Sequence, residues 1–274
     1  MAQQTQIARA EQYWRAWMAR FPTIGALAAA SPADVLRTWR GLGYDRRALN
    51  LLRCARAVVA EHGGSLPSAI EDLERLPGLG PYTARALAAL AFGQRVGAVD
   101  VNVRRVIWRI VGGPEGAAAI GASRLQAIAD EMVPADEPGR WTHALMDLGA
   151  TICRIREPRC GECPARPWCS AAAAWALVPE AAATATSRAA REPHARFTTT
   201  RRWLRGRILD RLREAEGDGW TTFDGPIGEH ELAAVEAALR TLAREGMVEL
   251  AEGGATDASE RPATALLRAR LPAR

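Results

Sequence analysis

Apolar residues in the first half of the chain recur at helical spacing, and short breaks that contain Pro or Gly separate one periodic segment from the next. The pattern predicts helices over 34–40, 45–61 and 68–75. Ser31 and Pro32 are expected at the N-cap and the first position of one helix start. No segment in this half alternates with a period of two residues, so we expect it to be all α.

A glycine-rich hairpin, L-P-G-L-G at 76–80, follows the third of these helices and precedes another that Pro81 opens. Gly78 and Gly80 are expected to adopt backbone conformations closed to other residues and to expose amides at the next helix start. Such amides bind anions, and a helix–hairpin–helix of this kind holds a DNA phosphate without reading base sequence. An ordinary turn is the alternative. The following helix is predicted to share one apolar face: Ala84, Leu87, Ala88 and Ala91.

The C-terminal third has a different pattern. Residues 171–196, rich in Ala, Thr and Ser, are predicted to form a linker. A basic amphipathic helix at 198–213 and a second helix at 229–246 are then expected, followed by strands at 247–250 and 265–269. This order indicates a small winged-helix-like module. Its basic helix either contacts DNA or packs against the rest of the chain.

The composition limits the kinds of protein that this chain can be. The chain has 274 residues, of which 48% are hydrophobic, enough for a sizeable core and two or three compact units. Its net charge of +5 favours a polyanionic partner. All 36 basic residues are arginine, so no lysine amine exists to form a Schiff base. The absence of a leader-like or spanning apolar run predicts a cytoplasmic protein without membrane insertion.

Four cysteines lie close together as C-x6-C-x2-C-x5-C: Cys153, Cys160, Cys163 and Cys169. Their thiolates suit the four irons of one [4Fe–4S] cube, which takes one cysteine per iron. Zinc is the competing interpretation, although structural zinc sites usually have two close pairs of ligands. The fifth cysteine, Cys54, shares the apolar face of a predicted helix and is expected to be a buried small residue.

An isolated acid, Asp100, lies in V-D-V-N-V-R-R-V at 99–106 and precedes a predicted helix. Aspartate is a common N-cap, and a carboxylate fixed at a helix entrance is also well placed to face a cationic transition state. Asn102, Arg104 and Arg105 are candidates to orient that carboxylate or to meet phosphate. Solvated surface arginines are the structural alternative.

These motifs resemble the helix–hairpin–helix DNA glycosylases with a [4Fe–4S] cluster, and within them the MutY-type adenine glycosylases. The resemblance covers residues 1 to about 170. Its matching segments are Q-Q-T-Q (3–6), G-L-G-Y (41–44), L-P-G-L-G-P-Y-T-A (76–84), V-D-V-N-V-R-R-V (99–106), M-D-L-G-A-T-I-C (146–153) and the cysteine run. We therefore expect a mainly α fold with a helical domain over 1–115, an iron–sulfur cluster domain over 116–170, a linker over 171–196 and a winged-helix-like domain over 197–274.

The resemblance also implies roles for single residues. Asp100 matches the aspartate that stabilises the oxocarbenium-like sugar, while Tyr82 and Asn102 match polar groups around the flipped adenosine. Gln4 matches a glutamine that wedges into the duplex, and Tyr44 a tyrosine that stacks there. Implied DNA contacts comprise Gln3, Gln4, Thr5, Leu42, Tyr44, Gly78, Gly80, Arg154, Arg156 and Arg159.

Two departures from the family pattern affect the chemistry. Bifunctional members similar to endonuclease III carry a catalytic lysine where this chain has Tyr82, so a monofunctional glycosylase is favoured. The general acid, a glutamate, would align two residues before Met1. We expect the upstream reading frame to encode it, and its addition to raise excision by about 10²-fold or more.

The expected function is therefore base excision repair by a monomeric adenine DNA glycosylase, acting on double-stranded DNA with adenine opposite guanine or 8-oxoguanine. Association with the nucleoid through DNA binding follows from this. Two alternatives remain: a uracil or thymine mismatch glycosylase, since Tyr82 and Asp100 do not fix the base, and a truncated, non-catalytic DNA-binding protein. The Nudix-like domain that many family members carry has no counterpart in the C-terminal pattern.

Overall fold

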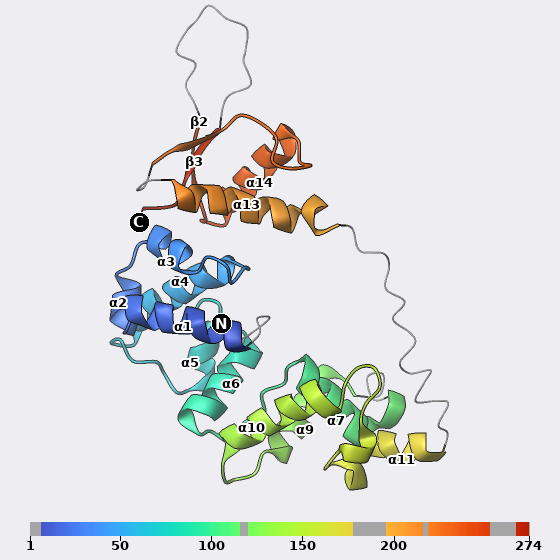
Figure 1. Ribbon diagram of the computed structural model, residues 1–274. Coiled ribbons are helices and arrows are strands. Elements are labelled where there is room, and N and C mark those ends of the chain that lie inside the picture. The colour runs from blue at the N-terminus through green and yellow to red at the C-terminus, as the bar shows by residue number, and fades with distance from the viewer. Residues whose placement is uncertain (1–6, 116–119, 178–195, 216–218, 253–266, 274) are drawn as a thin grey trace, which may run out of the picture. The chain divides into compact units, whose positions relative to one another are not determined.

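The protein is mainly helical, as the sequence predicts, in a computed structural model that describes residues 7–115, 120–177, 196–215, 219–252 and 267–273 (Figure 1). It divides into two compact units. Residues 1–66 and 193–274 form the first unit, and residues 67–192 form the second. The predicted boundaries at 115, 170 and 196 divide the chain differently and stay a prediction. Within the described ranges no helix is long and apolar enough to span a membrane.

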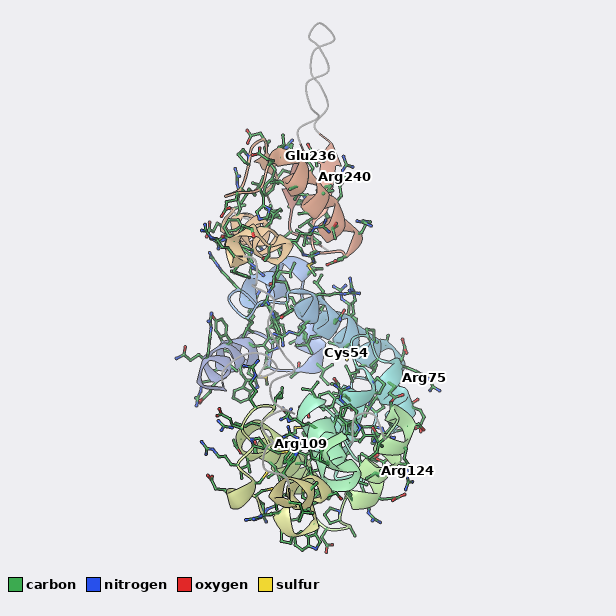
Figure 2. All side chains as sticks on the ribbon, turned by 90° about the vertical axis from the view of Figure 1, so that its right-hand side faces the viewer. Cys54, Arg75, Arg109, Arg124, Glu236 and Arg240 are labelled. Carbon is green, nitrogen blue, oxygen red and sulfur yellow. The ribbon has the colours of Figure 1, made fainter. Side chains whose placement is uncertain are left out.

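The N-terminal part of the first unit consists of α1 (Ile7–Arg20), α2 (Ile24–Ala28), α3 (Pro32–Thr38) and α4 (Arg46–Glu61). The Ser31 hydroxyl accepts a hydrogen bond from the Asp34 amide at 3.0 Å, which confirms the predicted cap. Trp17, Trp39 and Leu52 belong to one buried cluster beneath these helices. Cys54 is buried in α4 as expected (Figure 2), and burial raises the pKa of its thiol.

The C-terminal part of the same unit contains α13 (Arg201–Glu214), β1 (Thr221–Phe223), α14 (Leu232–Arg244), β2 (Glu249–Glu252) and β3 (Leu267–Arg270), coloured orange to red in Figure 1. The strands form one antiparallel sheet in the order β1-β3-β2. The sequence predicts two of these strands and misses the short β1. Two helices against a small sheet are what a winged-helix-like module requires, and we refer to 197–273 as the C-terminal module.

One core joins the two parts of the first unit. Four leucine and isoleucine side chains on one face of α13 are buried there: Leu204, Ile208, Leu209 and Leu212. Leu36 from α3 and Leu49 from α4 belong to the same buried cluster. The basic helix therefore packs against the rest of the unit, one of the two roles that its sequence predicts.

The second unit contains α5 (Ile70–Arg75), α6 (Pro81–Phe92), α7 (Val101–Gly112), α9 (Ala122–Met132), α10 (Pro138–Asp147) and α11 (Ser170–Leu177). Short 3-10 turns lie at Gly113–Glu115, Cys160–Glu162 and Arg166–Trp168, and a π-helical turn at Leu148–Ile152 extends α10. The apolar side of α7 supplies Val103, Val106 and Ile107 to the core of this unit.

Three sequence predictions need correction. Gly80 has an extended backbone (φ −88°) that other residues adopt, so only Gly78 (φ 84°) needs glycine. Ala91 is exposed, because the buried face of α6 turns toward Ala89 instead. The predicted linker over 171–196 begins with α11, which is anchored by buried Trp175. Residues 178–195 lie outside the described ranges.

Candidate active site

Asp100 is fixed at the start of α7 by the first amides of that helix. Its Oδ1 accepts hydrogen bonds from the backbone N–H groups of Asn102 at 2.8 Å and Val103 at 2.7 Å. The predicted N-cap is therefore present. The second carboxylate oxygen, Oδ2, accepts a hydrogen bond from the side-chain amide of Asn102 at 3.3 Å. Both oxygens are held in place, and the negative charge lies at the positive end of a helix dipole.

Tyr82, in the first turn of α6, belongs to the same site. Burial raises the pKa of its phenol, and the negative charge of Asp100 raises it further. The hydroxyl therefore stays protonated at neutral pH and is a hydrogen-bond donor. Its partner is the Met146 Sδ at 3.8 Å. A thioether is a weak acceptor, so a substrate oxygen or nitrogen displaces it at little cost.

Arg105 connects Asp100, through Asn102, to the cysteine-rich loop. Its Nη2 donates to the Asn102 side-chain oxygen at 3.0 Å and to the Gly149 carbonyl, and its Nε donates to the Cys153 carbonyl at 2.7 Å. Gly149 lies so close that an added Cβ would be 2.7 Å from the Asn102 Cβ. Asn102 thus has a fixed orientation between Asp100 and the π-helical turn. Of the two roles that the sequence allows for Arg105, the structure shows the orienting one, through Asn102.

All four clustered cysteines line one small cavity, together with Arg109 and Trp175. None of the four forms a disulfide. The Arg109 guanidinium lies 3.5 Å from the Cys153 Sγ and donates to the Arg154 carbonyl at 2.7 Å. Burial raises the pKa of the Cys160 thiol, and the other three cysteines raise it further. The predicted ligands therefore converge, and a cation from α7 faces them.

The predicted hairpin is also present. Leu76 is buried and anchors the turn, while Gly78 and Gly80 are exposed between α5 and α6. Gly80 is the N-cap of α6 and has no side chain to cap it, and a Cβ placed there would meet nothing within 4 Å. The start of α6 is therefore an open helix N-terminus next to Tyr82, of the kind that binds anions.

The first unit carries the other predicted DNA contacts. Tyr44 is 44% exposed in the turn before α4 and has a left-handed backbone (φ 50°). The Leu42 side chain is 6% exposed and packs in the core with Trp39. This burial does not support the DNA contact implied for Leu42, which stays a prediction. Gln3, Gln4 and Thr5 lie outside the described residues.

The arginines of the cysteine-rich loop differ in how far their side chains are exposed. Arg156 and Arg159 are exposed, and Arg159 lies 3.5 Å from Glu162. Arg154 is half-buried and donates to the Glu157 carbonyl at 3.1 Å, so its side chain turns back onto the loop. A phosphate contact is therefore better supported for the first two.

Sequence reasoning missed Arg109 and Met146. The available signal for Arg109 was helical spacing, because it follows Arg105 by one turn of α7 and so shares its face. Met146 lies in the segment 146–153 that the sequence singles out, but nothing in the pattern pairs it with Tyr82. Both contacts join residues far apart in the chain.

Comparison with known proteins gives concordant matches. The family profile described as "HhH-GPD superfamily base excision DNA repair protein" matches residues 1–126. An adenine DNA glycosylase of Mycobacterium tuberculosis is 46% identical over 217 residues, covering 79% of this chain and 68% of that protein. The adenine DNA glycosylase of Mycolicibacterium smegmatis is 38% identical over 254 residues, covering 93% and 83%. Because it covers 93% of the chain, this second match includes most of the C-terminal module.

A solved structure shares the fold. A thermostable thymine-DNA glycosylase superimposes with a TM-score of 0.58 and 27% identity, covering 63% of this chain and 80% of that one.

Proposed function

This chain belongs to the adenine DNA glycosylases of the HhH-GPD superfamily of base excision DNA repair proteins, and on that premise we propose that it excises adenine mispaired with guanine or 8-oxoguanine. It acts as a monomer on double-stranded DNA. The observation that carries the proposal is the fixed carboxylate of Asp100 beside the protonated hydroxyl of Tyr82.

The site suits cleavage of an N-glycosidic bond. As that bond breaks, positive charge develops on the sugar, and a carboxylate already held by two amides stabilises it without reorganisation. Tyr82 donates a hydrogen bond to the flipped nucleoside in place of its weak thioether partner. Asn102, oriented by Arg105, supplies a further polar group. Protonation of the leaving adenine needs a general acid, and the family pattern uses a glutamate for this step.

We expect a monofunctional reaction. Duplexes with adenine, thymine or uracil opposite guanine, and adenine opposite 8-oxoguanine, are incubated with the 274-residue chain and with an extended form, to which an N-terminal segment with a glutamate is added. Adenine should be released and leave an intact abasic site that is cut only after alkali. Borohydride should trap little covalent complex, because the chain has no lysine.

Two results would contradict this proposal. Release of thymine or uracil in preference to adenine favours the mismatch glycosylase; the structural neighbour is itself a thymine-DNA glycosylase. Mispair binding by the extended form without release of any base favours the non-catalytic binder.

We also infer that the four clustered cysteines hold a [4Fe–4S] cluster. They converge on one cavity, form no disulfide and face Arg109, whose charge suits an anionic thiolate cluster. Among the described residues no group of three or more His, Cys, Asp or Glu has the geometry to hold a metal ion. Structural zinc sites usually bring two close pairs of ligands, whereas this loop has one C-x2-C pair flanked by single cysteines, so the sequence spacing favours the cube.

The metal content tests this inference. The protein purified without oxygen is expected to be brown and to contain about four irons per chain. Cys163→Ser should lose the colour and most of the iron. Cys54→Ala, which alters a cysteine buried elsewhere, should keep both. One equivalent of zinc without iron in the unaltered protein contradicts the inference.

A further inference from the structure

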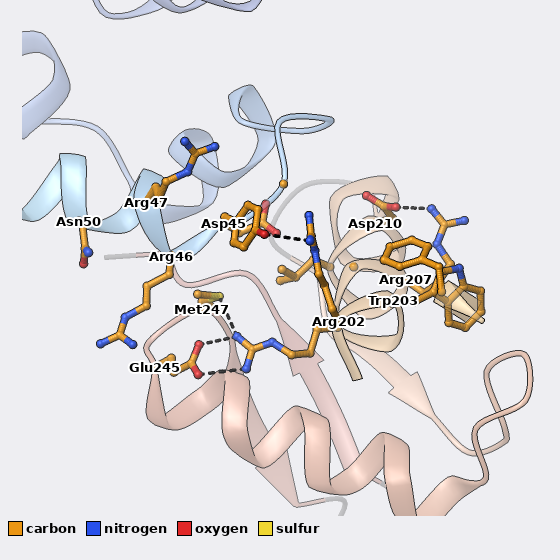
Figure 3. A pocket seen from close by; sticks show the side chains of 16 residues that line it. Asp45, Arg46, Arg47, Asn50, Arg202, Trp203, Arg207, Asp210, Glu245 and Met247 are labelled. Carbon is orange, nitrogen blue, oxygen red and sulfur yellow. Dashed lines mark hydrogen bonds and ion pairs between the residues drawn. The ribbon is translucent and has the colours of Figure 1, made fainter. Parts of the chain in front are cut away.

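A cleft of about 970 Å³ in the first unit lies between the turn that precedes α4 and the exposed face of α13. We call it the basic cleft. Figure 3 shows the side chains that line it, which all belong to one compact unit. Its charged lining comprises five arginines and three acids: Arg46, Arg47, Arg202, Arg205, Arg207, Asp45, Asp210 and Glu245. The excess of arginine favours a ligand with several negative charges.

The acids of the cleft are already paired within the protein. Asp45 and Asp210 both form ion pairs with Arg213, whose side chain is 4% exposed. Glu245 forms a two-pronged pair with Arg205, and hydrogen bonding from that arginine lowers the pKa of the Glu245 carboxyl. The acids therefore do little to repel an anion that enters the cleft.

Three arginines present charge to the cleft. Arg46 and Arg202 form no ion pair among the residues that the structure describes, and Arg207 is exposed although it pairs with Asp210. In Figure 3, Arg46 and Arg207 lie toward opposite ends of the cleft, with Arg202 between them. A row of cations along an open cleft matches successive phosphates of one strand better than one small anion.

Tyr44 forms part of the same cleft. The Arg202 guanidinium lies 4.1 Å from the centre of its ring, and Arg202 Nη1 donates to its hydroxyl at 2.9 Å. The ring nevertheless remains 44% exposed. Exposed aromatic rings next to arginines are the surfaces on which nucleobases stack in nucleic-acid sites. The cleft thus combines a stacking surface with charges for the backbone.

We propose that the basic cleft binds the phosphate backbone of DNA, with Arg46, Arg202 and Arg207 contacting successive phosphates beside Tyr44. The C-terminal module is then a DNA-binding part of the protein, and α13 has two roles. Its apolar face packs in the core, and its arginine face meets the strand. The inference rests on the proposed function only in taking DNA as the ligand.

The test measures binding of the full chain to a labelled duplex with an adenine–guanine mispair over a series of salt concentrations. The slope of log K against log salt is negative, and each lost phosphate contact makes it shallower by about 0.9. Arg46→Gln with Arg207→Gln should therefore make it shallower by about 1.8. Arg240→Gln makes the same kind of change on exposed α14 outside the cleft (Figure 2) and should keep the slope of the unaltered protein.

Two outcomes overturn the proposal. In the first, the double variant has the same slope as Arg240→Gln. In the second, every variant loses the same steepness per charge removed, which means that only the net charge of the protein matters. Single-turnover adenine release by saturating protein separates this inference from the proposed function. If the cleft variants change the slope but the unaltered protein releases no adenine, only the proposed function is contradicted. If the unaltered protein releases adenine and the cleft variants keep its slope, only DNA binding by the cleft is contradicted.

Discussion

Replacing Asp100 with asparagine is expected to lower adenine release in a single turnover by about 10³-fold. Asparagine retains the side-chain oxygen that accepts from the amides of Asn102 and Val103, so α7 keeps its cap and the fold survives. Only the negative charge is lost, and in the proposed mechanism that charge faces a cation that exists only in the transition state. DNA affinity should therefore change little, as binding assays on the same variant would show.

Two further variants make this result interpretable. Asp100→Ala removes both charge and cap, and it should also lose about 1 kcal/mol of stability. Asp136→Asn makes the same chemical change at an exposed position and should behave as the unaltered protein. An Asp100→Asn protein that releases adenine as fast as Asp136→Asn shows that another group stabilises the sugar. All measurements use the extended form with the added N-terminal glutamate.

The features that the sequence predicts well are local ones. Ser31 caps α3, Pro81 opens α6 and Asp100 caps α7, because each of these depends on hydrogen bonds or backbone angles within one turn of helix. Motif spacing also placed Tyr82 and Asp100 in one site, through the resemblance to a family. The sequence alone had no means of giving their distance or the thioether partner of Tyr82.

The features that it does not predict depend on tertiary contacts. Arg105 reaches the Cys153 carbonyl across 48 positions in the chain, and Gly149 packs against Asn102 across a similar interval. The π-helical turn at Leu148–Ile152, which brings Gly149 there, arises from one shifted hydrogen-bond register and has no clear compositional signal. These contacts explain why M-D-L-G-A-T-I-C matters, although the sequence identifies it only as a matching segment.

Residues within one motif differ in burial and in backbone conformation. Leu42 lies next to Tyr44 in the motif G-L-G-Y, yet the turn points the leucine into the core and leaves the tyrosine exposed. Gly80 shares its motif with Gly78, yet only Gly78 has a positive φ. A motif shows that a segment matters, and the backbone decides which of its side chains reach the ligand.

The C-terminal module illustrates the same limit on a larger scale. Periodicity predicts an amphipathic helix near 198–213, but it does not indicate which surface covers the apolar face. The structure buries Leu204 and Leu209 against Leu36 and Leu49 of the N-terminal helices. The arginines on the other face consequently lie opposite the turn that carries Tyr44, and this placement creates the basic cleft.

Replacing Arg213 with methionine is expected to destabilise the first unit by about 3–5 kcal/mol. The side chain is 4% exposed and pairs with Asp45 and with Asp210 at 3.2 Å, and its Nε donates to the Leu36 carbonyl at 3.0 Å. Methionine fills a similar volume but leaves Asp45 without its buried partner. Asp45 adjoins Tyr44, so the change should also loosen the turn at the proposed DNA-binding cleft and weaken DNA binding. Urea unfolding followed by tryptophan fluorescence measures the first effect, and mispair binding measures the second.

A matched control and a double variant decide whether the ion pair is responsible. Arg240→Met removes an exposed arginine and should change the free energy of unfolding by less than about 0.5 kcal/mol. Combining Arg213→Met with Asp45→Asn removes the stranded charge, so the double variant should recover part of the stability that Arg213→Met loses. Equal losses in Arg213→Met and Arg240→Met, or no recovery in the double variant, would mean that apolar burial alone holds α13 against the N-terminal helices. In that case the turn at Tyr44 would keep its position without Arg213, and mispair binding by Arg213→Met would match that of the unaltered protein.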